Sequence, residues 1–105
     1  MQIPKRFKLL GQTINVVWDA CHFIERTDAA AFASYRLKEI QMNPNVSYQT
    51  EEAKQQTFLH ELVHFILYYS ESSYQGKTDY MHQDEGFVDL TASLLHQALT
   101  TMEYE

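Results

Sequence analysis

The sequence contains little of what several classes of protein require. Cys21 is the only cysteine, so an internal disulfide and a thiolate-rich structural zinc site are both excluded. This composition fits the reducing cytosol best, and we expect Cys21 to be a small core residue. Only three glycines and two prolines occur in 105 residues, and no segment is of low complexity. We therefore expect one folded domain over residues 1–105.

Excess positive charge and long apolar runs are also missing. The formal net charge is -6, which argues against a nucleic-acid partner. A small basic cluster, Lys5, Arg6 and Lys8, is expected on a solvated strand face rather than at a phosphate site. No apolar run reaches the length of a membrane span or of a signal-peptide core. We therefore expect a cytoplasmic protein that makes no membrane contact.

Alternating polar and apolar residues predict two β-hairpins in the first half of the chain. The expected strands are residues 5–10, 13–18, 29–35 and 38–43. The first pair turns at Gly11-Gln12 and the second around Arg36-Leu37, with Ile40 and Met42 facing the core. The alanine-rich start of the second pair could instead begin a short helix.

Two long helices are predicted in the second half. Thr50 can cap a helix that begins with two glutamates and runs to about Tyr69. A loop is expected over residues 70–81, and a last helix over about 84–102 with a wide apolar arc. That arc comprises Phe87, Val88, Leu90, Ala92, Leu94, Leu95, Ala98 and Leu99. The predicted fold class is α+β, a small antiparallel sheet followed by two long helices.

The most informative pattern is His-Glu-x-x-His inside the first of these helices. His60 and His64 lie one helical turn apart, so their imidazoles share a face and can bind one cation. Glu61 stands beside them, where it can act as general base on a water that the metal activates. The flanking residues are bulky and uncharged, so this helix should be buried on most sides, and a metal would compensate the burial of these polar groups. Core histidines held by ordinary hydrogen bonds are the plain alternative, and His22 and His96 are expected to be structural or exposed.

A catalytic zinc takes three protein ligands, so one more donor is required. Glu85 is our choice, because Glu85 and Asp89 share a face of the last helix with small and apolar residues. Asp89 could accept the free ring N–H of a ligating histidine and fix its orientation. His82 and Asp84 are rival ligands, and an exposed acidic helix start that only favours the dipole is the plain alternative.

Together these residues resemble the gluzincin metallopeptidases, which carry His-Glu-x-x-His on one helix and Glu-x-x-x-Asp on a second, downstream helix. Here the pattern reads His60, Glu61 and His64, followed by Glu85 and Asp89. The small domain is similar in size to the minigluzincins and to the phage-associated proteins related to the ImmA/IrrE group. The resemblance covers residues 50–98 best.

The resemblance implies a zinc metallopeptidase that acts on a peptide or protein substrate, with Glu61 as general base. It also implies an extended substrate paired with an edge strand, which we expect to be residues 38–43. Larger gluzincins supply transition-state donors from a further helical subdomain, and here Tyr80 and His82 are the expected donors. The alternative is a metal-binding, catalytically latent interaction domain that acts as a regulator in a mobile-element or phage system.

Overall fold

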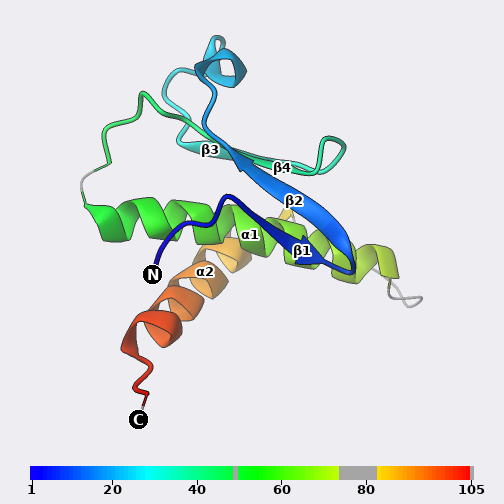
Figure 1. Cartoon of the computed structure of the whole chain (residues 1–105), viewed down its shortest axis with the longest axis vertical. Helices are drawn as coiled ribbons and strands as arrows, with labels where there is room; N and C mark the ends of the chain where they lie inside the picture. Colours follow the sequence, from blue (N-terminus) through cyan, green and yellow to red (C-terminus); the bar gives the residue numbers. More distant parts are fainter. Residues whose placement is uncertain (49, 74–82, 105) are drawn as a thin grey trace.

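The computed structural model describes residues 1–48, 50–73 and 83–104. Four strands form one sheet, and two α-helices follow them in the chain (Figure 1). The strands are β1 (Arg6–Leu9), β2 (Gln12–Val17), β3 (Ala31–Ser34) and β4 (Glu39–Met42). The helices are the 3-10 helix η1 (Ala20–Phe23) between β2 and β3, and then α1 (Glu51–Ser73) and α2 (Glu85–Thr101). This element order confirms the predicted α+β class.

The sheet is mixed rather than purely antiparallel, with the strand order β1-β2-β4-β3. Both predicted hairpins form, but β2 and β4 pair in parallel, with Val16 opposite Ile40. After β2 the chain crosses to the far edge to begin β3, so β4 returns beside β2 in the same direction. The expectation that residues 38–43 form an edge strand is therefore wrong, because β4 is interior and β3 is the edge.

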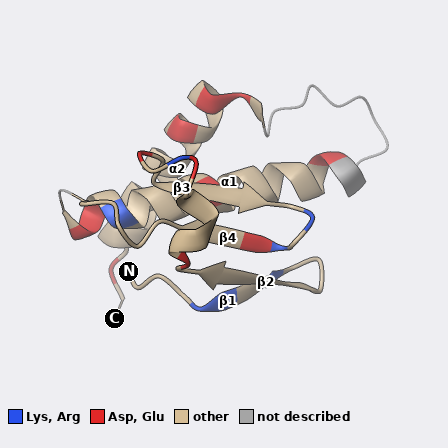
Figure 2. Cartoon of the chain, turned by 90° about the horizontal axis from the view of Figure 1, so that it is seen from above, with Lys and Arg blue, Asp and Glu red and all other residues tan. Residues whose placement is uncertain are grey.

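The elements are stacked in the order sheet, α1, α2 (Figures 1 and 2). α1 begins as predicted, with Thr50 Oγ1 accepting a hydrogen bond from Ala53 N at 3.0 Å. It continues past the expected end at Tyr69 to Ser73, so the first part of the predicted loop is helical. The rest of that loop, residues 74–81, lies outside the described residues.

The core lies between the sheet and α1 and extends to the near side of α2. Its buried apolar side chains are Ile14, Val16, Ile40, Met42, Phe58, Leu59, Val63, Phe65, Val88 and Ala92. Ile40 and Met42 have no exposed surface, which confirms the predicted inward face of β4. α2 is apolar over a wider arc than it buries, since Leu90 and Leu94 on its outer side remain 60% and 57% exposed.

Two predictions about surface residues have opposite outcomes. The basic cluster of Lys5, Arg6 and Lys8 is exposed as expected, and Figure 2 shows Lys and Arg along β1 and at the turn between β3 and β4. Cys21 is exposed, so its assignment to the core is wrong. It lies in η1 rather than in a strand, and its N–H donates to Asp19 Oδ1 at 2.9 Å.

Neither of the long helices, over its described residues, is apolar enough to cross a bilayer.

Asn43 ties the end of β4 to the chain that enters β3. The side chain is 1% exposed, and its Nδ2 donates to Ala29 O at 2.8 Å and to Thr27 O at 3.3 Å. Its Oδ1 accepts from Asn45 N at 2.9 Å. These bonds hold the segment before β3 in place, and β3 in turn borders the candidate site described below.

We predict that Asn43→Ala lowers the free energy of unfolding by about 1–3 kcal/mol, because it leaves two carbonyl groups and one N–H without their partner. Urea denaturation measures this change. Asn45→Ala is the matched control, since its side chain is exposed and should change stability by less than about 0.5 kcal/mol. Equal stability of the Asn43→Ala protein and the parent would show that this anchor contributes nothing.

Candidate metal centre

α1 presents two histidines on the side that faces α2. The i, i+4 spacing aligns His60 and His64 on one face of the helix, and their side chains are 22% and 9% exposed. Other sides of this segment are packed into the core. Phe58, Leu59, Val63 and Phe65 are all buried, whereas Ile66 is 38% exposed. The prediction of a helix buried on most sides is thus confirmed, with Ile66 as the exception.

Two imidazoles and one carboxylate converge at the contact between α1 and α2. Glu85 Oε2 lies 2.9 Å from His60 Nε2, and Glu85 Oε1 lies 3.0 Å from His64 Nε2. The two Nε2 atoms are 3.2 Å apart, and all three ligand atoms lie within 4.8 Å of one another. Tetrahedral ligands about 2.0–2.2 Å from a cation are separated by roughly 3.3–3.6 Å, slightly more than these distances. The group can therefore hold a metal ion.

Asp89 stands behind one of these imidazoles. Its Oδ1 is 3.5 Å from His60 Nδ1, the ring nitrogen that is not turned toward Glu85. This separation exceeds an ordinary hydrogen bond, and the Asp89 side chain is 79% exposed. A small movement would bring the carboxylate within hydrogen-bond distance of His60 Nδ1, where it could orient the ring as a metal ligand. This predicted role of Asp89 stays a prediction.

Asp84, one of the two rival third ligands, is not part of the cluster. Asp84 caps α2, since its Oδ1 accepts a hydrogen bond from Phe87 N at 3.0 Å. This bond occupies the carboxylate at the helix start, one residue before Glu85. His82 lies outside the described residues, as does Tyr80, so the two predicted transition-state donors are not placed here.

The two remaining histidines lie away from the cluster. His96 is 6% exposed, and its Nε2 lies 2.9 Å from Gln55 Oε1 on α1. It therefore links the far end of α2 to α1, which agrees with the predicted structural role. His22 is exposed in η1.

Glu61 is a buried carboxylate beside the metal-binding group. It is 7% exposed, and its Oε2 accepts no hydrogen bond from the described residues. Burial raises the pKa of Glu61 to about 7; nearby His60 lowers this pKa and Glu85 raises it further. Burying a carboxylate without a partner is costly, and such groups concentrate at functional sites. A pKa near neutrality also suits a general base.

A cleft of about 500 Å³ runs between this cluster and the edge strand β3. Its lining residues are Ala30, Ala31, Phe32, Ala53, Gln56, Thr57, His60, Glu61, Glu85 and Asp89. Ala30 O accepts from the N–H of Asn43, the residue that follows β4, at 2.9 Å. Because the pairing alternates in an antiparallel ladder, the backbone groups of Ala31 and Ala33 then point to the free edge.

Tyr35, which lies near enough to Glu61 and Glu85 to feel their charges, was not identified by the sequence analysis. Its ring stacks on Tyr68 with centroids 4.2 Å apart and meets Phe65 edge-on at 5.1 Å. Burial raises the pKa of its hydroxyl, and the carboxylates of Glu61 and Glu85 raise it further, so the group stays protonated and able to donate. A single tyrosine at the end of a strand has no spacing pattern, so only the tertiary structure identifies it.

No protein-family model, curated protein or solved structure matches this chain. The resemblance to the gluzincins therefore rests on the spacing of the two motifs and stays a prediction.

Glu61 should make the stability of the metal-free protein depend on pH. Its pKa of about 7 in the folded state lies above the value of 4.5 expected in the unfolded chain. Between these values the folded state binds more protons, so this group lowers stability as the pH rises from 4.5 to about 7, by at most about 3 kcal/mol. Glu61→Gln removes this contribution.

Urea denaturation of both proteins in the presence of a chelator measures the effect. The Glu61→Gln protein should gain stability over the parent as the pH rises through this window, and the gain should level off above it. A difference that is the same at every pH would show that Glu61 titrates normally.

Proposed function

We propose that this protein is a zinc-dependent metallopeptidase. The observation that carries the proposal is the convergence of His60, His64 and Glu85 next to the buried carboxylate of Glu61. Two histidines and a glutamate are a ligand set of zinc hydrolases, in which a fourth position stays open. A purely structural zinc site uses four protein ligands and needs no buried base beside them.

In this proposal the chain's own residues divide the work. Bound zinc would supply a Lewis acid that polarises a peptide carbonyl and makes an attacking water more acidic. His60, His64 and Glu85 hold the ion, and Asp89 orients the His60 ring through Nδ1. Glu61 takes the proton of the attacking water and passes it to the leaving amine. Burial raises the pKa of Glu61 in the metal-free protein, which suits a carboxylate that must first take up a proton and then release it.

We further propose that the substrate is an extended peptide that pairs with β3. An edge strand offers a row of unpaired N–H and C=O groups, and those of Ala31 and Ala33 lie at this edge. Ala31 and Glu61 both line the cleft of about 500 Å³, which supports placing the peptide there. β3 thus replaces residues 38–43 as the pairing strand.

Tyr35 is our candidate for a hydrogen-bond donor to the substrate carbonyl oxygen as it becomes negative. Its hydroxyl lies close enough to Glu61 and Glu85 for both carboxylates to raise its pKa. The stacked Tyr68 ring and the Phe65 ring restrict its orientation, and a restricted donor favours the transition state.

One observation favours the alternative function, a latent metal-binding interaction domain. Leu90 and Leu94 are more than half exposed on the outer side of α2, and exposed apolar side chains that lie close together are typical of contact surfaces. A zinc-loaded parent protein that cleaves no peptide would favour this function over hydrolysis.

We predict one zinc per chain, held through His60, His64 and Glu85. His64→Ala and Glu85→Ala should each abolish stoichiometric zinc, whereas Asp89→Ala should weaken affinity by about 10- to 100-fold. Metal analysis after dialysis and competition with a chelating dye give these values. His22→Ala is the control and should bind zinc as the parent does, because His22 is exposed in η1. Retention of one zinc by both the His64→Ala and Glu85→Ala proteins would place the metal elsewhere.

We also predict that the zinc-loaded parent cleaves members of a diverse peptide library, detected by mass spectrometry. Glu61→Gln should reduce the rate by at least about 100-fold with unchanged zinc content, because it removes the proton acceptor and leaves the ligands in place. Cleavage by the Glu61→Gln protein at the parental rate would refute the assigned role of Glu61.

A further inference from the structure

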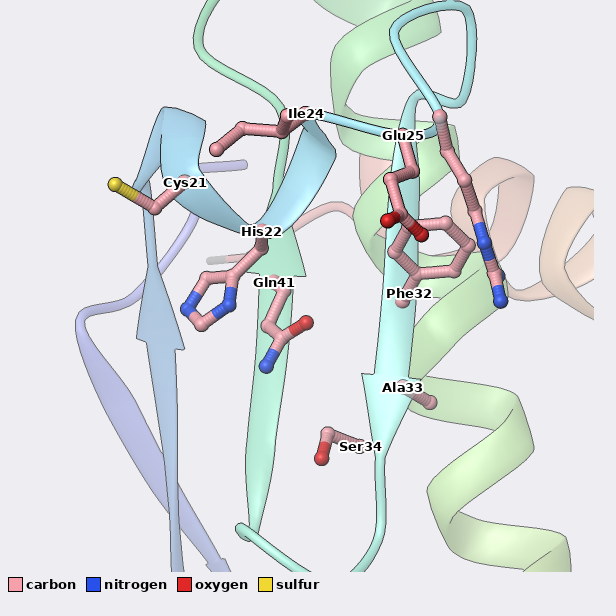
Figure 3. Close-up of a pocket in the computed structure, with 9 residues that line it drawn as sticks. Cys21, His22, Ile24, Glu25, Phe32, Ala33, Ser34 and Gln41 are labelled. Carbon is pink, nitrogen blue, oxygen red and sulfur yellow. The ribbon is translucent and has the colours of Figure 1, made fainter.

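We propose that a second cleft, on the opposite face of β3, selects an acidic side chain of the bound peptide. The proposal rests on the proposed function, since it deepens the description of the same substrate. The cleft measures about 570 Å³ and lies against η1, β3 and β4. Figure 3 shows Gln41 and Ser34 on its floor with His22 of η1 beside them, on the face of the sheet away from α1.

β3 separates this cleft from the cleft of the metal centre. Phe32 lines both of them, so a peptide paired with β3 would border both. Successive side chains of an extended peptide point to opposite faces of the sheet. A residue whose side chain enters the metal-centre cleft therefore has neighbours whose side chains enter the second cleft.

Arg26 supplies the charge that favours an acidic side chain. Its Cζ lies 4.6 Å from the centroid of the Phe32 ring, which also stacks on buried Phe23 at 5.2 Å. The guanidinium is thus anchored on the edge strand although the side chain is exposed. Among the described residues no carboxylate pairs with Arg26. Its planar set of N–H groups therefore remains available for a bidentate contact with a carboxylate.

The charges on the two sides of β3 differ. In the metal-free protein the metal-centre cleft carries the acidic residues Glu61, Glu85 and Asp89, which disfavour an acidic side chain there. In the second cleft Glu25 is the one acidic lining residue, beside Arg26. An acidic side chain is therefore favoured in the second cleft, and its position sets which peptide bond lies at the metal centre.

The test measures binding rather than hydrolysis. The probes are three blocked peptides, Thr-Val-X-Val-Thr with X as Glu, Gln or Lys. Each is titrated into ¹⁵N-labelled, zinc-loaded Glu61→Gln protein, and the amide signals of Ala31, Ala33 and Arg26 are followed. We expect the Glu peptide to bind at least about fivefold more tightly than the Gln peptide, and the Lys peptide to bind most weakly.

Two further substitutions, each made in the Glu61→Gln protein, test the two charged residues of the second cleft one at a time. Arg26→Gln should remove the preference for the Glu peptide, and Glu25→Gln should increase it. Both residues are exposed, so neither substitution disturbs the core, and the amide spectrum checks that each variant is folded. Because the Glu peptide could also bind zinc, the titrations are repeated without the metal, where the preference should persist.

Equal binding of the Glu and Gln peptides, a preference that survives Arg26→Gln, or no response at β3 to any peptide would overturn the proposal. Failure of the proposed function is read separately, from zinc content and library cleavage by the parent protein. The preference for the Glu peptide over the Gln peptide can be measured whether or not the parent protein binds zinc and cleaves peptides.

Discussion

The packing of α2 against α1 is the contact on which the candidate site depends. Val88 and Ala92 are buried one turn apart on α2, and this places Glu85 and Asp89, each three residues earlier, over the histidines of α1. His96 joins the same two helices at the other end through Gln55. Without this contact, His60 and His64 would share a helix face but would have no carboxylate to complete a three-ligand set.

The sheet provides the second constraint. α1 is fixed by the core beneath it, where Ile40 and Met42 of β4 are fully buried. Because β3 is the edge strand next to β4, its free backbone groups lie along the cleft that contains His60 and Glu61. Asn43, at the end of β4, anchors the chain that leads into this strand. The candidate metal ligands and a free strand edge therefore border the same cleft.

Glu61 shows a cost that a site of this kind carries. A carboxylate with 7% exposure and an unpaired oxygen destabilises a metal-free fold, and a glutamine would avoid this cost. A role in proton transfer would explain why a buried carboxylate lies beside this candidate metal-binding group.

Local periodicity predicted much of this arrangement. The spacing of His60 and His64, the capped start of α1 and the hairpin around Arg36-Leu37 depend on neighbours in the sequence, and the structure contains each of them. The spacing of Glu85 and Asp89 also predicted correctly which face of α2 lies near the histidines.

Features that depend on distant segments were not accessible from the sequence. Pairing within a hairpin is local, but the parallel join of β2 to β4 depends on where residues 18–30 cross the sheet, so the edge strand was assigned wrongly. Cys21 was expected in the core because of its residue type, but it lies in η1 and is exposed. Tyr35 and the Arg26–Phe32 contact likewise arise only when separate segments meet.

Anomalous diffraction at the zinc absorption edge, on crystals grown with one equivalent of zinc, tests the central claim most directly. It should show a single peak about 2.0–2.2 Å from His60 Nε2, His64 Nε2 and a Glu85 carboxylate oxygen, with no fourth protein ligand and with Glu61 outside the coordination sphere. A peak at another group of residues would contradict this centre. A fourth protein ligand, or coordination by Glu61 itself, would make the site structural and contradict its assignment as a hydrolase.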